Sequence, residues 1–229
     1  MKYLSIQEAI FLKRPNRFIA HVLLNGREEI VHVKNTGRCK EILKKGVKVI
    51  LEEASNPNRK TKYSLVAAYK DDHTLINIDS QITNYVVYDA LIHSEVGELK
   101  DFIKLKKEVK YKNSRFDFYY EKDHEKGFIE VKSVTLEENG NCMFPDAPTE
   151  RGRKHIEELI HLQKEGYKNY IFFLIQIENM KIFRPNKVTD PHFEEALQRA
   201  KEKGICILAY DSIVKEDEIK INKKVHTSL

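Results

Sequence analysis

Apolar and polar residues alternate in short runs over the first third of the chain, which is the pattern of β-strands that bury one face. Strands are expected at 17–24, 28–33, 47–53, 62–69 and 74–78, and a short helix at 39–44. Asn25-Gly26 predicts a tight hairpin between the first two strands. Several short strands within residues 1–80 favour a small OB-fold-like β-barrel, and an SH3-like barrel fits the pattern nearly as well.

The pattern changes after residue 80, where segments with helical spacing begin to alternate with apolar strands. Helices are expected at 81–93, 149–163 (with Thr149 as its N-cap) and 191–203. Strands are expected at 106–111, 115–120, 128–135, 170–176 and 205–210, with 180–184 pairing with 170–176. We expect a loop at 139–149 and frayed residues after about 215. The chain is therefore predicted to be an α/β (α+β) protein, with a barrel domain in 1–80 and a mixed-sheet domain in 81–229.

Two neighbouring strands of the second part carry acids and a lysine that could meet. Glu130 and Lys132 share one face of their strand, because side chains alternate along a strand. Asp117 lies on the preceding strand, on the face opposite Phe116 and Phe118. A short turn would join the two strands as a hairpin and bring Asp117 near Glu130 and Lys132. The alternative interpretation is an ordinary ion pair on a solvated surface.

Two carboxylates and an amine at one point suit a hard cation such as Mg²⁺ or Mn²⁺. Asp117, Glu130 and the Val131 carbonyl would hold the metal, and Lys132 would hold or activate a water. The metal would neutralise charge on a phosphodiester under attack. An Asp followed on the next strand by Glu-x-Lys is the layout of the PD-(D/E)xK nuclease core. Glu98 could add an acid to this site, or it could be a solvated helix residue.

Basic residues are concentrated in the first part of the chain. Residues 1–80 contain 15 Lys and Arg against 9 Asp and Glu, a net charge of +6, whereas the remainder of the 229-residue chain carries −1. This asymmetry indicates an anionic partner, most simply nucleic acid, with ordinary solubilising charge as the alternative. The candidate nucleic-acid contacts are Arg14, Arg17, Arg38, Arg59, Lys60, Lys62, Arg151, Lys154 and His155. The last three begin a helix, where cations oppose the helix dipole unless an anion lies nearby.

The three cysteines form no CxxC pair, which excludes a zinc ribbon or a disulfide framework and favours a reducing compartment. The sequence lacks the apolar run of a signal peptide, and it contains no stretch of about 18 apolar residues. We therefore expect a cytoplasmic protein with no membrane partner.

Several motifs resemble the sugar fermentation stimulation protein family, SfsA. They are Asn35-Thr36-Gly37-Arg38, Ser114-Arg115-Phe116-Asp117-Phe118, Glu130-Val131-Lys132-Ser133-Val134-Thr135-Leu136, Phe144-Pro145-Asp146-Ala147 and Thr149-Glu150-Arg151-Gly152-Arg153-Lys154-His155. The resemblance implies an OB-fold-like domain joined to a PD-(D/E)xK nuclease-like domain, DNA binding, and in enteric bacteria a link to regulation of maltose metabolism. It places the metal site on Asp117 and Glu130, with Lys132 beside them and Glu98 as a further acid. One departure from the wider nuclease superfamily is that Phe116, not Pro, precedes Asp117.

Three functions remain open from the sequence. The first is a metal-dependent nuclease that uses Asp117, Glu130 and Lys132. The second is a DNA-binding regulator of sugar metabolism genes whose nuclease-like site only binds. The third, a sugar-processing protein, has only the family name in its favour, because the sequence shows no carboxylate pair at glycosidase geometry.

Overall fold

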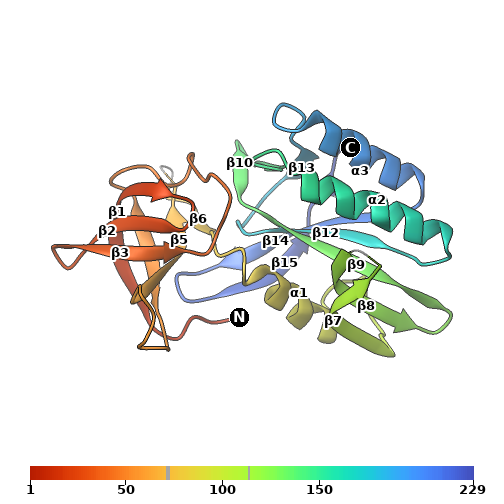
Figure 1. Cartoon of the computed structure of the whole chain (residues 1–229), viewed down its shortest axis with the longest axis horizontal. Helices are drawn as coiled ribbons and strands as arrows, with labels where there is room; N and C mark the ends of the chain where they lie inside the picture. The colour runs from red at the N-terminus through yellow and green to blue at the C-terminus, as the bar shows by residue number, and fades with distance from the viewer. Residues whose placement is uncertain (71–72, 113) are drawn as a thin grey trace.

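The N-terminal strands close into a barrel in the computed structural model, which describes residues 1–70, 73–112 and 114–229 (Figure 1). The strands are β1 (Ile6–Asn16), β2 (Ile19–Leu24), β3 (Arg27–Val33), β4 (Lys48–Glu53), β5 (Tyr63–Tyr69) and β6 (Leu75–Asn77). They follow the order β3-β2-β1-β4-β5-β6, and a further pairing of β3 with β5 closes the first five into a ring. The expected barrel is therefore confirmed, with β6 attached to its outside.

Two predictions for this lobe are wrong. The strand β1 was missed because register shifts after Phe11 and Lys13 break its alternation, and because Pro15 lies near its end. The expected helix at 39–44 is a turn at 40–42, which is followed by a second turn at 45–46. Cys39 has a φ of +46°, which a right-handed helix does not allow, and Cys39, Ile42 and Leu43 fill the barrel core from an irregular segment. These three residues have helical spacing along the chain because a loop buries all of them in the core, and they do not form a helix.

The second lobe is built on a six-stranded mixed sheet with the order β15-β14-β12-β9-β8-β7. Its strands are β7 (Lys104–Tyr111), β8 (Ser114–Lys122), β9 (Glu125–Val134), β12 (Tyr170–Ile175), β14 (Cys206–Val214) and β15 (Ile219–Lys224). Helix α1 (Thr83–Ile92) covers one face, and α2 (Glu150–Lys164) and α3 (Pro191–Glu202) cover the other (Figure 1). None of the helices in the described part of the chain has the length and apolar composition needed to cross a bilayer.

The side chains of the central strands alternate between two hydrophobic clusters. On β12, Phe172 and Leu174 pack in the cluster that contains α1, whereas Ile171 and Phe173 pack in the cluster that contains α2 and α3. Strand β9 lies between β8, to which it is antiparallel, and β12, to which it is parallel. Both faces of the central part of β9 are therefore covered, and a polar side chain there lies within the interior or at a gap in the packing.

A smaller sheet joins segments whose strands or pairing the sequence pattern did not predict. Its strands are β10 (Leu136–Glu138), β11 (Asn141–Phe144), β13 (Ile182–Pro185) and β16 (His226–Thr227). The expected loop at 139–149 thus contains β11, and the expected pairing of 180–184 with 170–176 is wrong, because β13 pairs with β11 and β16. The expected fraying after 215 is also wrong. Ile219 and Ile221 are buried while the lysines between and after them point outward, so β15 is an amphipathic edge strand.

Candidate active site

Strands β8 and β9 separate at Asp117, and this irregularity creates the site. Backbone pairing runs from Lys122 and Glu125 to Phe118 and Ile129 and then stops. Two residues after Ile129, the Val131 N–H donates to Asp117 Oδ2 at 2.7 Å, so a carboxylate takes the place of a backbone partner on β8.

The prediction that Phe116 and Phe118 share a face is wrong for the same reason. The ring of Phe116 packs 5.0 Å from that of Phe128 in the cluster under α2, whereas Phe118 stacks on Tyr88 of α1. The strand therefore changes the face that it presents at Asp117, which directs this side chain toward the edge of β9.

The Asp117 carboxylate is held on both oxygens. Besides the bond from Val131, Asn84 Nδ2 of α1 donates to Oδ1 at 2.7 Å. Burial, followed by the negative charge of Glu130, raises the pKa of Asp117 to about 6, although the two hydrogen bonds and Lys132 favour the charged form. Nothing in the sequence distinguished Asn84 from the other polar residues of its helix.

Glu130 is almost completely buried, with 3% of its surface exposed. Its Oε1 is bonded to both Lys132 Nζ and His155 Nδ1, and the latter comes from the second turn of α2. Burial alone would raise the pKa of Glu130, but Lys132 and His155 together hold it below its ordinary value. Its Oε2 is buried and has no hydrogen-bond partner among the residues that the structure describes. A charged oxygen in this situation requires a cation or a donor from outside the chain.

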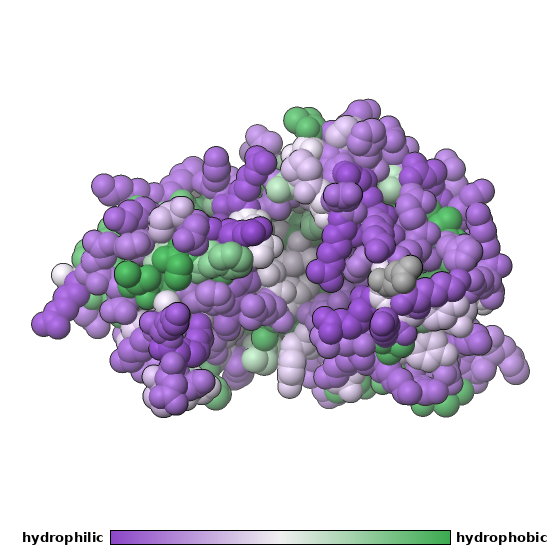
Figure 2. All heavy atoms as spheres, viewed as in Figure 1, coloured by the Kyte–Doolittle hydropathy of each residue, from purple (hydrophilic) through white to green (hydrophobic). Residues whose placement is uncertain are grey.

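Asp117, Glu130 and Lys132 line a pocket of about 550 Å³ at the junction of the two lobes. The barrel contributes Arg17 and the loop 35–37, and the second lobe contributes the start of α1, the segment 143–149 and the start of α2. Figure 2 shows the surface hollowed between the lobes in this region. Thr149 caps α2 as expected, because its Oγ1 accepts from the Gly152 N–H.

Comparison with known proteins covers the whole chain. The SfsA N-terminal OB domain model matches residues 12–78, and the sugar fermentation stimulation protein RE domain model matches residues 81–218. The chain belongs to the SfsA family. Sugar fermentation stimulation protein homologues are 51% identical in Alkaliphilus oremlandii, over 98% of this chain and 97% of that one, and 54% identical in Clostridium perfringens, over all of both chains. The expected OB-type barrel and mixed α/β fold are confirmed.

A solved SfsA structure has the same architecture. "The structure of Pyrococcus Furiosus SfsA in complex with Ca2+" superimposes with a TM-score of 0.91 at 30% identity, covering 100% of this chain and 98% of that chain. The agreement extends over both lobes, so the junction between them belongs to the shared SfsA architecture.

Only part of the predicted basic set of this SfsA chain lies at the pocket. Arg17 and Arg151 line it, and His155 contacts Glu130. Arg14 has a different role, because its guanidinium donates at 2.6–2.9 Å to four backbone carbonyls of the segment 17–38. Arg59 is bonded to Thr61 and Ser64, and Lys62 is paired with Glu53. The remaining three, Arg38, Lys60 and Lys154, are exposed outside the pocket lining.

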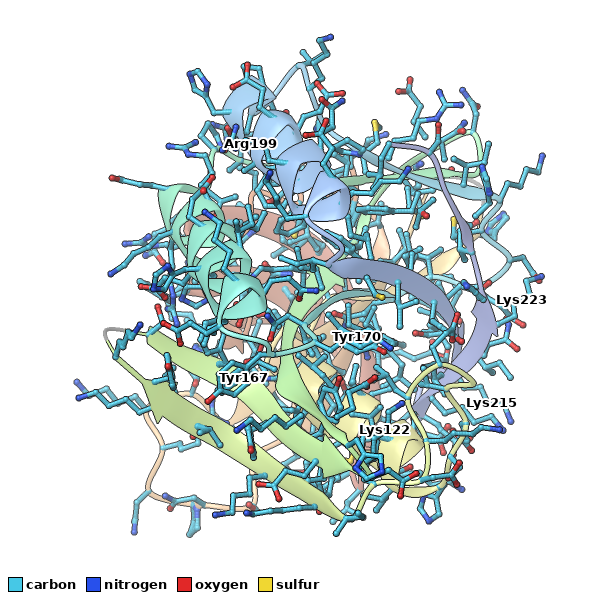
Figure 3. All side chains as sticks on the ribbon, turned by 90° about the vertical axis from the view of Figure 1, so that its right-hand side faces the viewer. Lys122, Tyr167, Tyr170, Arg199, Lys215 and Lys223 are labelled. Carbon is cyan, nitrogen blue, oxygen red and sulfur yellow. The ribbon has the colours of Figure 1, made fainter. Side chains whose placement is uncertain are left out.

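Glu98 does not join the other acids of the SfsA site. Its carboxylate accepts from Tyr210 and pairs with Lys224, and it lines a separate recess with Lys122. Figure 3 looks at the end of the second lobe that faces away from the barrel, where Lys122 is labelled. The suggestion that Glu98 is a further metal ligand therefore needs correction.

The raised pKa of Asp117 predicts how stability depends on pH. The folded state binds the Asp117 proton more tightly than the unfolded chain does, so protonation of Asp117 stabilises the fold. This contribution to the free energy of unfolding is complete below about pH 3.8 and is lost as the pH rises through about 6. With divalent cations removed, Asp117→Asn should therefore raise the melting temperature at pH 7.5 more than at pH 4.5. Thermal melts at the two pH values, in EDTA, measure this. An equal change in melting temperature at both pH values would mean that ionisation of Asp117 does not destabilise the fold.

Proposed function

We propose that this SfsA protein is a divalent-metal-dependent enzyme that cleaves nucleic-acid phosphodiester bonds, DNA foremost, through a PD-(D/E)xK nuclease-like site. One observation carries the proposal: the unpartnered Oε2 of buried Glu130 lies in a pocket that also contains Asp117 and Lys132. Buried side-chain oxygens in structural ion pairs usually have a hydrogen-bond partner, as both oxygens of the buried Asp79 and Glu137 do. A carboxylate with one oxygen held and the other left open is typical of a ligand site.

The residues fit Mg²⁺ or Mn²⁺ better than zinc. Among residues 1–70, 73–112 and 114–229, no three His, Cys, Asp or Glu side chains are grouped to hold a metal ion. Zinc takes three or four such ligands, whereas Mg²⁺ uses one or two carboxylates and fills its remaining positions with water and phosphate. Asp117 and Glu130 supply two carboxylates. The Val131 carbonyl is available too, because its N–H faces Asp117 and the C=O of a strand residue points to the same side. The Ca²⁺ named for the Pyrococcus furiosus protein has the same preference for oxygen.

Charge balance in the pocket also supports a bound cation. Its ionised lining residues are Arg17, Lys132 and Arg151 against Asp117, Glu130 and Asp146, so the side chains bring no excess positive charge. A phosphodiester in this lining would lie beside two carboxylates, and a bound divalent ion would offset their repulsion. When bound, the metal would neutralise charge on the phosphate and make its bound water a better nucleophile. Lys132 would position that water, and Arg17 and Arg151 would hold neighbouring phosphates.

The second candidate is a DNA-binding regulator without turnover. The net charge of +6 in residues 1–80 favours it, because most of that charge lies on the barrel outside the pocket. For both candidate functions we place the protein in the cytoplasm, where a reducing environment would preserve the free thiols of Cys39, Cys142 and Cys206.

The test is incubation of end-labelled DNA and RNA, single- and double-stranded, with Mg²⁺, Mn²⁺ or EDTA. We expect cleavage with a divalent ion, none in EDTA, and a large loss in Lys132→Ala and Asp117→Asn. Cleavage that these two changes leave intact would rule out the site. Binding without cleavage under every condition would support the regulator instead.

A further inference from the structure

We infer that the site takes one nucleic-acid strand at a time, so that the substrate is single-stranded nucleic acid or a single-stranded tail on a duplex. The inference rests on the proposed function and specifies its substrate. Three features of the pocket carry it: the depth of Glu130, the hydrogen bonds that tie the walls together, and an exposed aromatic ring beside the entrance.

Glu130 lies too deep in the pocket for an intact duplex to reach it, whereas Asp117 is half-buried. Glu130 is 3% exposed, the Lys132 side chain is 15% exposed, and the pocket around them measures about 550 Å³. That volume is in the range that encloses a small molecule. A pocket of about 550 Å³ has the volume of a cube with edges of roughly 8 Å, whereas the major groove of a B-form duplex alone is about 12 Å wide. The whole helix therefore cannot enter. A phosphate on a strand that has left the duplex can enter the pocket and reach Glu130, much as enzymes that do chemistry on a base take the target nucleotide out of the stack.

Hydrogen bonds tie the barrel wall of the pocket to the second lobe and oppose its widening. The barrel loop at 35–38 touches the second lobe where the Arg38 N–H donates to Asp146 Oδ2 at 2.8 Å. A Cβ atom at Gly37 would overlap that carboxylate, so the contact is already close. The same loop is held from behind by the guanidinium of Arg14 and by the Asn35 side chain, which donates to the Ile78 carbonyl at 2.9 Å. Together these bonds brace the barrel wall against the second lobe.

An exposed aromatic ring stands next to the entrance on the barrel side. Phe18 is 48% exposed, and the guanidinium of its neighbour Arg17, which lines the pocket, lies 5.0 Å from the ring centre. The turn beneath it is rigid, because Asn16 Oδ1 accepts from the N–H groups of Phe18 and Ile19. An aromatic platform with an arginine beside it binds the bases of a single strand, whereas the bases of a duplex are already stacked on one another.

The experiment compares four fluorescent oligonucleotides of one sequence: single-stranded, blunt duplex, and duplex with a 5′ or a 3′ tail. Binding is followed by fluorescence anisotropy in Ca²⁺ and about 200 mM salt. Salt at this concentration weakens binding that depends only on contacts to the phosphate backbone. Cleavage is followed in Mn²⁺. We expect the single strand and at least one tailed duplex to bind and be cut, and the blunt duplex to bind at least roughly tenfold more weakly. Phe18→Ala should weaken single-strand binding roughly tenfold. The matched control is Ile30→Ala, which removes an apolar side chain of equal exposure (49%) from β3, away from the pocket.

Each outcome bears on one claim. Equal binding and cutting of the blunt duplex would overturn the single-strand inference and leave the proposed function standing. No binding or cleavage of any oligonucleotide would overturn the proposed function itself. A single-strand preference that Phe18→Ala and Ile30→Ala reduce equally, or that neither affects, would remove Phe18 as the platform.

Discussion

Replacing Glu130 with Gln should reduce metal-dependent cleavage at least about a hundredfold. Partners that only orient a metal ligand are worth about 10–100-fold in affinity or activity, so loss of the ligand itself should cost more. The amide keeps the shape of the side chain but removes the charge that Lys132 and His155 balance, together with the open oxygen. The measurement is the initial rate of oligonucleotide cleavage in Mn²⁺, with a far-ultraviolet circular dichroism spectrum to show that the variant is folded.

The matched control is Glu98→Gln. Glu98 is also an acid with a lysine partner, although it is less buried than Glu130 and lies in the other recess. Its replacement should leave the cleavage rate within about twofold of the wild type. A folded Glu130→Gln protein that cuts at the wild-type rate, or a Glu98→Gln protein that does not cut at all, would contradict the assignment of the site.

Replacing Gly127 with Ala should destabilise the fold by about 3 kcal/mol or more, at the upper end for overpacking, because the obstacle is backbone. A Cβ atom there would overlap the carbonyl oxygen of Lys168, lie 2.6 Å from its carbonyl carbon and lie 3.0 Å from the Tyr120 ring. The Lys168 N–H also donates to the Lys126 carbonyl at 2.9 Å, so the two segments cannot separate without losing that bond. Urea unfolding measures the change.

Gly97→Ala is the control for the loss of a glycine. Within the described part of the chain, no atom beyond the two adjacent residues lies within 4 Å of a Cβ built at Gly97, and the φ of Gly97 is not in the left-handed region. The free energy of unfolding of the Gly97→Ala variant should therefore differ from that of the wild type by less than about 1 kcal/mol. Equal stability of the two variants would mean that β9 and the segment before β12 can shift apart at Gly127.

The alternation of side chains predicted the central strand and the residues that face the site. Period-two spacing put Glu130 and Lys132 on one face of β9, and they are bonded to each other there. The predicted cap of α2 was equally local, because Thr149 accepts from the Gly152 N–H in the first turn of that helix.

What the sequence could not predict depends on irregular or distant contacts. The shift of face at Asp117 arises where β8 leaves β9, and no residue in the run marks that point. His155 and Asn84 reach the site from helices that lie 25 and 33 residues away along the chain from Glu130 and Asp117. Only some of the predicted basic residues lie at the pocket, because a charge in the sequence does not reveal its partner: Arg14 supports a loop and Lys62 pairs with Glu53.

The central claim is that Asp117 and Glu130 together hold a divalent cation, and calorimetric titration of Mn²⁺ into the metal-free protein tests it most directly. We predict saturable binding in the wild type, weakened at least about tenfold in Asp117→Asn and in Glu130→Gln and unchanged in Glu98→Gln. Absence of binding to the wild type, or binding that Asp117→Asn and Glu130→Gln leave unchanged, would contradict the account.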